Sequence, residues 1–111
     1  MLFAGLAVRD FTTARAWYER FFDRAADVVA HDHEVMWRIS DRAWLYIVQD
    51  DAHAGNGSVA MSVPDISATV AALHTRGIEA GPIAREGDAG RKTVVVDPDG
   101  NSIAILQVAS Q

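Results

Sequence analysis

The chain repeats one pattern of strand, aspartate and helix, and this repeat restricts its possible folds more than any other feature. Residues 3–11 and residues 58–66 each run from an alternating apolar stretch into an aspartate and then into a helix-like stretch. Three pairs of residues correspond between them: Leu6 and Met61, Val8 and Val63, Asp10 and Asp65. Residues 39–49 and 97–107 also correspond. A duplicated supersecondary unit predicts a pseudo-symmetric domain.

Each copy of the repeat predicts a strand, a helix and three further strands. Residues 11–22 and 66–76 have helical apolar spacing, with Asp10 and Asp65 as expected N-caps and Gly77 as an expected C-cap. Strands are expected over residues 3–9, 26–30, 34–40, 43–49, 58–63, 78–84, 91–96 and 102–108. The predicted fold class is α+β, with two β-α-β-β-β modules.

The predicted organisation is one domain over residues 1–111. Module one covers about 1–50, a polar and glycine-rich linker covers 51–57, and module two covers about 58–108. The stretch Arg85 to Gly90 is expected to be a flexible loop.

Composition excludes several classes of protein. Half of the residues are hydrophobic, which argues against disorder, and the net charge of −5 with scattered basic residues argues against nucleic acid as a partner. The lack of cysteine removes disulfides and thiol chemistry and fits a reducing cytoplasm. The N-terminal stretch has no signal-peptide pattern, and no apolar run approaches the roughly 20 residues of a membrane helix. We therefore expect a cytoplasmic protein with no membrane partner.

The chain resembles the vicinal oxygen chelate superfamily, which includes glyoxalase I, bleomycin-resistance proteins and extradiol dioxygenases. The resemblance covers essentially the whole chain. It depends on Leu6-Ala7-Val8-Arg9-Asp10 leading to Ala16-Trp17-Tyr18-Glu19, and on the C-terminal run Asp97-Pro98-Asp99-Gly100-Asn101-Ser102-Ile103-Ala104-Ile105-Leu106-Gln107. It implies that the two modules curl their sheets around a cavity, and that the protein is a homodimer, as many members are.

Enzymes of this superfamily hold a divalent metal on His, Glu or Gln side chains at one position of the first and last strand of each module. The corresponding residues here are Phe3, Tyr46, Ser58 and Ala104. Phenyl and methyl groups cannot bind a metal, and neutral hydroxyls are weak ligands. Gln49 and Gln107 are the nearest substitutes. The resemblance therefore implies no metal and no other cofactor, and we assign no catalytic residue.

Strand alternation suggests a cavity that is aromatic on one side and rich in hydroxyl groups on the other. The candidate ligand-binding residues are Phe3, Trp37, Trp44, Tyr46, Ser58, Ser62, Thr93 and Ser102, with Arg91 (or Lys92) placed to meet an anionic ligand at the rim. The alternative is that the rings, Trp37 and Phe3 above all, simply fill a core. Trp17 is expected to pack the first helix against the sheet.

Three functions remain open at this point. The first is a metal-free protein that binds a small, partly aromatic molecule, as drug-sequestering members do; the acidic net charge would suit a cationic drug. The second is a metal-dependent lyase or dioxygenase with atypical ligands. The third is a non-catalytic structural or regulatory dimer. His74, on the second helix, is the histidine best placed to act as a base near neutral pH if that helix lines the cavity.

Overall fold

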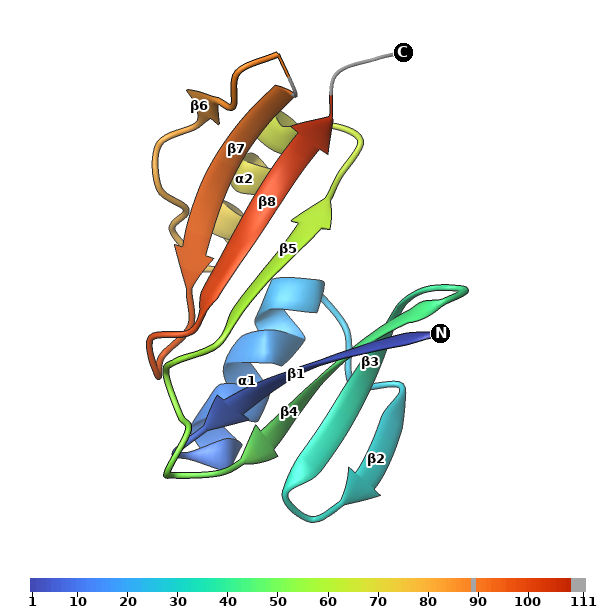
Figure 1. Ribbon diagram of the computed structural model, residues 1–111. Helices are drawn as coiled ribbons and strands as arrows, with labels where there is room; N and C mark the ends of the chain where they lie inside the picture. The colour runs from blue at the N-terminus through green and yellow to red at the C-terminus, as the bar shows by residue number, and fades with distance from the viewer. Residues whose placement is uncertain (89, 109–111) are drawn as a thin grey trace.

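The computed structural model describes residues 1–88 and 90–108, which form two modules joined end to end (Figure 1). Module one consists of β1 (Leu2–Val8), α1 (Phe11–Phe22), β2 (Val28–His31), β3 (Glu34–Ser40) and β4 (Ala43–Gln49). Module two consists of β5 (Ser58–Ser62), α2 (Ile66–Thr75), β6 (Ala84–Arg85), β7 (Gly90–Val96) and β8 (Ser102–Val108). The predicted α+β fold with two β-α-β-β-β modules is confirmed.

One predicted strand is largely wrong. Of the expected strand over 78–84, only Ala84 belongs to a strand, because β6 is limited to Ala84–Arg85 and pairs there with β7. Pro82 precedes it and has no N–H to donate to a sheet ladder. The approaching chain is bonded to β7 at Gly81, whose N–H donates to the Val94 carbonyl and whose carbonyl accepts from the Thr93 hydroxyl. Ala89, in the expected loop, lies outside the described residues.

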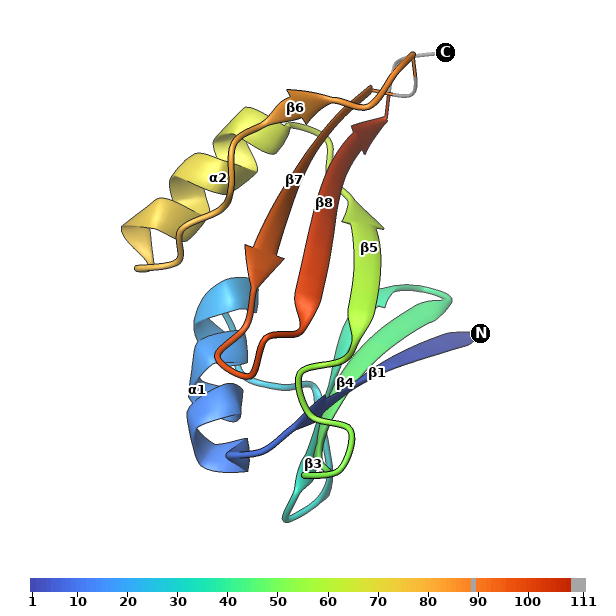
Figure 2. The same cartoon turned by 60° about the vertical axis from the view of Figure 1, so that its left-hand side comes forward.

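The two sheets have the same topology. Their strand orders are β1-β4-β3-β2 and β5-β8-β7-β6, and the first and last strands of each module, β1 with β4 and β5 with β8, are parallel neighbours. Figures 1 and 2 show that α1 and α2 lie on the same side of the molecule, each covering one face of its own sheet. The other face of each sheet, here called the open face, is not covered by a helix.

Module one has the larger core because α1 carries a stripe of aromatic side chains. Asp10 accepts a hydrogen bond of 3.2 Å from the Thr13 N–H and starts the helix, which typically stabilises a helix by about 1 kcal/mol. The buried side of α1 consists of Phe11, Ala14, Trp17, Tyr18 and Phe21. It packs on the alternate strand residues Leu6, Val8, Val35, Trp37, Leu45 and Ile47. Trp17 therefore packs helix against sheet, as expected.

The turn Asp97-Pro98-Asp99-Gly100-Asn101 joins the two modules. Asn101, which is fully buried, donates to the Ala7 carbonyl at 2.9 Å, and the Arg9 N–H donates to the Asp99 carboxylate at 3.0 Å. The Tyr18 hydroxyl reaches across from α1 and donates to Asp97 at 2.8 Å. The signature turn of the sequence is therefore a structural joint.

The linker packs against this joint and follows a defined path. The Gly57 N–H donates to the side-chain oxygen of Asn101 at 2.8 Å. Gly55 has a φ of +84°, and a Cβ there would lie 2.3 Å from the Asp99 carbonyl oxygen. Only glycine fits this position, both for its backbone conformation and for the close approach.

A second contact joins the helices. The guanidinium of Arg76, which directly follows α2, donates to the carbonyls of Arg20 and Phe21 at 2.6 and 3.1 Å. These carbonyls belong to the last turn of α1, where acceptors lack partners within the helix. The placement of module two on module one is thus fixed at both the turn and the helix ends. Neither helix among the described residues is long and apolar enough to cross a membrane.

Candidate functional site

The open face of module one contains three rows of side chains that cross β1, β4 and β3. The strand register sets the rows Phe3–Trp44–Arg38, Gly5–Tyr46–Met36 and Ala7–Val48–Glu34. The rings of Phe3 and Trp44 are stacked, with centroids 6.5 Å apart and planes within 19°. Phe3 is 53% exposed, so this aromatic pair lies at the surface of the isolated chain.

Tyr46 lies over the glycine of its own row. A Cβ on Gly5 would come within 2.2 Å of Tyr46 Cζ, so the ring occupies the space that any larger residue would need. The missing side chain on β1 therefore lets a flat aromatic ring lie down against the strand. Phe3, Trp44 and Tyr46 thus lie on one face of β1 and β4, and we call these three residues the aromatic shelf.

The open face of module two has small side chains at the corresponding places. Its rows are Ser58–Ser102–Val96, Ala60–Ala104–Val94 and Ser62–Leu106–Lys92. The three serines predicted as ligand contacts, Ser58, Ser62 and Ser102, therefore lie on the open face, as do Phe3, Trp44 and Tyr46. Whether these six residues contact a ligand remains a prediction.

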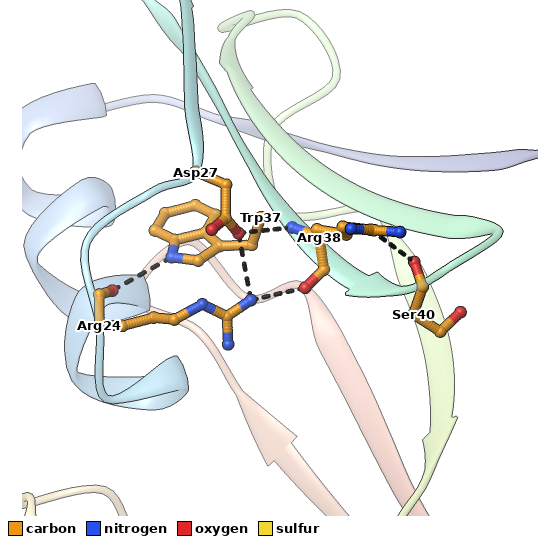
Figure 3. A network of polar contacts seen from close by, with 5 residues as sticks. All are labelled: Arg24, Asp27, Trp37, Arg38 and Ser40. Carbon is orange, nitrogen blue, oxygen red and sulfur yellow. Dashed lines mark hydrogen bonds and ion pairs between the residues drawn. The ribbon is translucent and has the colours of Figure 1, made fainter.

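Trp37, another predicted contact, lies on the opposite face of the sheet, and its assignment to the cavity is corrected. Its side chain is fully buried beneath α1, between Tyr18 and Phe22. Figure 3 shows the indole Nε1 donating to the carbonyl of Arg24, at 3.2 Å. The side chain is thus a core group with a satisfied donor. The alternation of β3 misled the assignment because Val35, Met36 and Trp37 are apolar on both faces.

Thr93 and Arg91 also lie on the helix side of their sheet. Thr93 is 2% exposed, and its hydroxyl donates to the Gly81 carbonyl at 2.6 Å. The Arg91 guanidinium donates to the side-chain oxygen of Gln107 at 3.3 Å. The open face carries Lys92, Val94 and Val96 of β7 instead. The run Val94-Val95-Val96 is apolar on both faces, so the sequence alone could not fix which face is open.

The four positions that correspond to the metal ligands of the superfamily's enzymes lie on the open faces, but their chemistry does not fit a metal. Phe3 and Ala104 have no donor atom, and only the hydroxyls of Tyr46 and Ser58 remain. Of the suggested substitutes, Gln107 is directed elsewhere, since its side-chain oxygen accepts from the Ile66 N–H at 2.9 Å, at the start of α2. Gln49 pairs with Val8, on the helix side of its sheet. Within residues 1–88 and 90–108, no group of three or more His, Cys, Asp or Glu side chains is placed to hold a metal ion.

His74 does not lie on the open face either. It is part of α2, which covers the other side of the sheet, and its Nδ1 contacts the Glu79 carboxylate at the surface. The condition for its role as a base, that α2 lines the cavity, is not met.

Two hollows lie beside the sheets, and the first takes only Trp44 and Ala60 from the open-face rows. An apolar one of about 70 Å³ lies between the modules and is bordered by Leu2, Ala4, Ile39, Ala43, Trp44, Leu45, Val59, Ala60 and Met61. A shallow trough of about 310 Å³ lies beside β6 and β7 and is bordered by Gly81, Pro82, Ala84, Glu86, Lys92, Thr93 and Val94. Ligand pockets usually measure about 300–1,000 Å³. The apolar hollow is smaller than this and touches the aromatic shelf only at Trp44, and the trough contains no shelf residue, so neither hollow encloses a ligand on the shelf.

Comparison with known proteins agrees with this architecture. The family model described as the Glyoxalase/Bleomycin resistance protein/Dioxygenase superfamily matches residues 2–105. The chain belongs to this superfamily. No match was found among curated protein sequences.

Several solved structures share the fold. A glyoxalase/bleomycin resistance protein from Catenulispora acidiphila is 35% identical, with 97% of each chain covered and a TM-score of 0.90. An antibiotic-binding protein from a Streptomyces species is 22% identical, over 96% of this chain and 93% of that one, with a TM-score of 0.78. A bleomycin-binding protein solved with bleomycin is 18% identical, over 98% of each chain, with a TM-score of 0.81.

Proposed function

We propose that this protein binds a small, partly aromatic molecule on its open faces, without a metal, in the manner of a drug-sequestering protein. The observation that carries the proposal is the aromatic shelf: Phe3 and Trp44 stack at the surface beside Tyr46. Exposed stacked rings offer a flat ligand both apolar area and favourable ring geometry. The hydroxyls of Ser58, Ser62 and Ser102 supply polar contacts on module two. Similarity in fold to antibiotic-binding proteins supports the proposal but does not name the ligand.

We propose further that the binding form is a homodimer, in which a second copy covers the open faces. The shelf lacks a cover within one chain, and Phe3, Val94 and Val96 of the open faces are 53%, 38% and 56% exposed. Exposed apolar surface of this kind marks an interface. Sedimentation equilibrium at tens of micromolar should therefore give twice the chain mass of 12.0 kDa. A mass of one chain would contradict the dimer.

The binding proposal is tested with Trp44→Ala in a calorimetric screen of flat aromatic compounds. Loss of the Trp44 ring should weaken binding by roughly tenfold or more, since one stacked aromatic contact contributes about 1–3 kcal/mol. Val29→Ala is the control, because Val29 is an exposed apolar residue on the edge strand β2 that pairs with Val35 and therefore lies on the other face of the sheet. Equal affinity of Trp44→Ala and the parent protein would refute the role of the shelf.

Metal content distinguishes this function from the enzymatic alternative. Protein prepared without a histidine tag should contain no stoichiometric metal by mass spectrometry and should bind Ni, Zn, Mn and Fe(II) only weakly. One tightly held ion per cavity would favour the lyase or dioxygenase. A dimer that binds neither metals nor aromatic compounds would favour the structural or regulatory alternative.

A further inference from the structure

We propose that the molecule bound on the aromatic shelf carries an anionic group beside its flat ring, and that Arg38 binds this group. The inference rests on the proposed function, since it concerns the ligand of the same site. It assigns the ligand a charge and gives Arg38 the role of determining specificity.

The first argument is position. Arg38 is the register partner of Trp44, which in turn pairs with Phe3, so all three side chains lie in one row across the open face. A flat ring stacked on Phe3 and Trp44 therefore has a guanidinium at the end of its row. A substituent that extends from such a ring toward β3 meets Arg38 first.

The second argument is the availability of the guanidinium. Its contacts within the chain are the Asp41 carboxylate at 3.0 Å and the Ser40 carbonyl at 3.4 Å. The Asp41 side chain is 96% exposed, and ion pairs in such positions contribute little. A guanidinium has five N–H donors in a planar fork that fits a carboxylate or sulfonate. A ligand anion can share this fork with Asp41 or displace it.

The third argument is the charge of the open faces. In the six rows described above, the charged residues are Arg38, Glu34 and Lys92. Glu34 lies two rows from Phe3 and has His31 at 3.8 Å. Apart from Asp41, which pairs with Arg38, the acidic residues that give the chain its net charge of −5 therefore lie outside these rows. The expectation that the net charge suits a cationic drug does not apply to this face, where an anionic ligand is the better complement.

Arg38 can be replaced without dismantling the surrounding fold. Figure 3 shows that the main chain of Arg38 makes the bonds to Asp27 and Arg24: its N–H donates to Asp27 at 2.7 Å and its carbonyl accepts from Arg24, whereas its guanidinium contacts the Ser40 carbonyl. A substitution of the side chain leaves both bonds in place. Arg38→Gln should therefore melt at nearly the same temperature as the parent protein.

The test compares three probes with one ring: naphthalene-2-carboxylate, neutral naphthalene-2-methanol and cationic naphthalene-2-methylammonium. Calorimetry should show the carboxylate binding roughly five- to tenfold more tightly than the alcohol, because a charge-assisted hydrogen bond is added. Arg38→Gln should abolish this preference and leave the affinity for the alcohol unchanged. Asp41→Asn should increase the preference, since it removes the competing carboxylate.

Two controls make the outcome specific. Arg42→Gln removes an exposed arginine from the same hairpin, and Lys92→Gln removes the cation on the open face of module two; both should keep the preference. The inference is overturned if the ammonium probe binds most tightly, if the three probes bind equally, or if the preference follows Lys92 or Arg42. If none of the probes binds, the proposed function itself fails, and the inference with it.

Discussion

The phenol of Tyr18 in module one donates a hydrogen bond of 2.8 Å to the carboxylate of Asp97 in module two. Tyr18 has no exposed surface, and Asp97 is 4% exposed. Burial first, and the adjacent Asp97 carboxylate second, raise the pKa of Tyr18 well above its ordinary value of 10.0. The native protein thus keeps the phenol protonated, as the joint between the modules requires.

This joint predicts a loss of stability at alkaline pH. Below pH 10 the phenol is protonated in the native and the unfolded states, and its contribution to stability is complete. Above pH 10 the unfolded state releases the proton while the native state retains it, so the free energy of unfolding falls by up to about 1.4 kcal/mol per pH unit. Denaturant melts between pH 8 and pH 11 would measure the slope.

Tyr18→Phe should remove this alkaline slope and lower the free energy of unfolding at pH 7 by about 1 kcal/mol. The matched control is Tyr46→Phe, which alters the other of the two tyrosines and should keep the slope. The same slope in Tyr18→Phe as in the parent protein would show that other groups cause the alkaline loss.

Asn101 is the second test of the joint. Its amide group donates to the Ala7 carbonyl and to Asp97, at 2.9 and 2.8 Å, and accepts from the Gly57 N–H. Asn101→Ala removes these three hydrogen bonds, while Asp97 keeps the bond from Tyr18, and should lower the free energy of unfolding by about 2–3 kcal/mol. Asn56→Ala, in the exposed part of the linker, should change it by less than about 0.5 kcal/mol. Similar melts for the two variants would contradict a structural role for Asn101.

The sequence predicted the local structure well because its signals are local. Asp10 and Asp65 cap the helices they precede, and alternation correctly placed Phe3, Trp44 and Tyr46 together on one face. Alternation could not determine which residues of β3 and β7 face the helix and which lie on the open face, because apolar residues occupy both faces of these strands. The contact between Tyr18 and Asp97 could not be predicted for another reason: the two residues are 79 positions apart, and no local pattern specifies their pairing.

The two tryptophans of the first sheet should respond differently to truncation. Trp37→Ala opens a cavity in the core and removes the bond to the Arg24 carbonyl, so the free energy of unfolding should fall by about 3–5 kcal/mol. Trp44→Ala, on the open face, should cost much less stability and mainly weaken ligand binding. Melting curves and calorimetry on both variants measure the contrast. The reverse pattern would mean that the open face has been assigned to the wrong side of the sheet.

Gly5 and Tyr46 should show strong coupling in a double-mutant cycle. Gly5→Ala places a methyl group where the Tyr46 ring lies, so the ring must move, at a cost of about 1–3 kcal/mol. In a Tyr46→Ala background the same substitution meets no ring and should cost far less. Chemical denaturation of the four proteins gives the coupling energy. Additive effects would show that Tyr46 does not lie over Gly5.

The lowered pKa of Asp27 predicts that the stability of the protein falls in acid. The hydrogen bond from the Arg38 N–H, and then that from the Arg24 side chain, hold the pKa of Asp27 below its ordinary value of 3.8. Its contribution to stability is therefore present above pH 3.8 and is lost as the pH falls through the lower native value. Asp27→Asn should be less stable than the parent protein at pH 7, and the difference should shrink below pH 4. A difference that stays constant from pH 7 to pH 2 would contradict this assignment.

The Asp97-to-Asn101 turn, which makes the chain recognisable as a member of its superfamily, holds the modules together and contains none of the four open-face positions that carry the metal in enzymes of the superfamily. The architecture and the chemistry therefore depend on different residues. Membership of the superfamily, recognised by that turn, is therefore evidence about the architecture of the chain. Its reactivity has to be inferred separately, from the individual residues of the open faces.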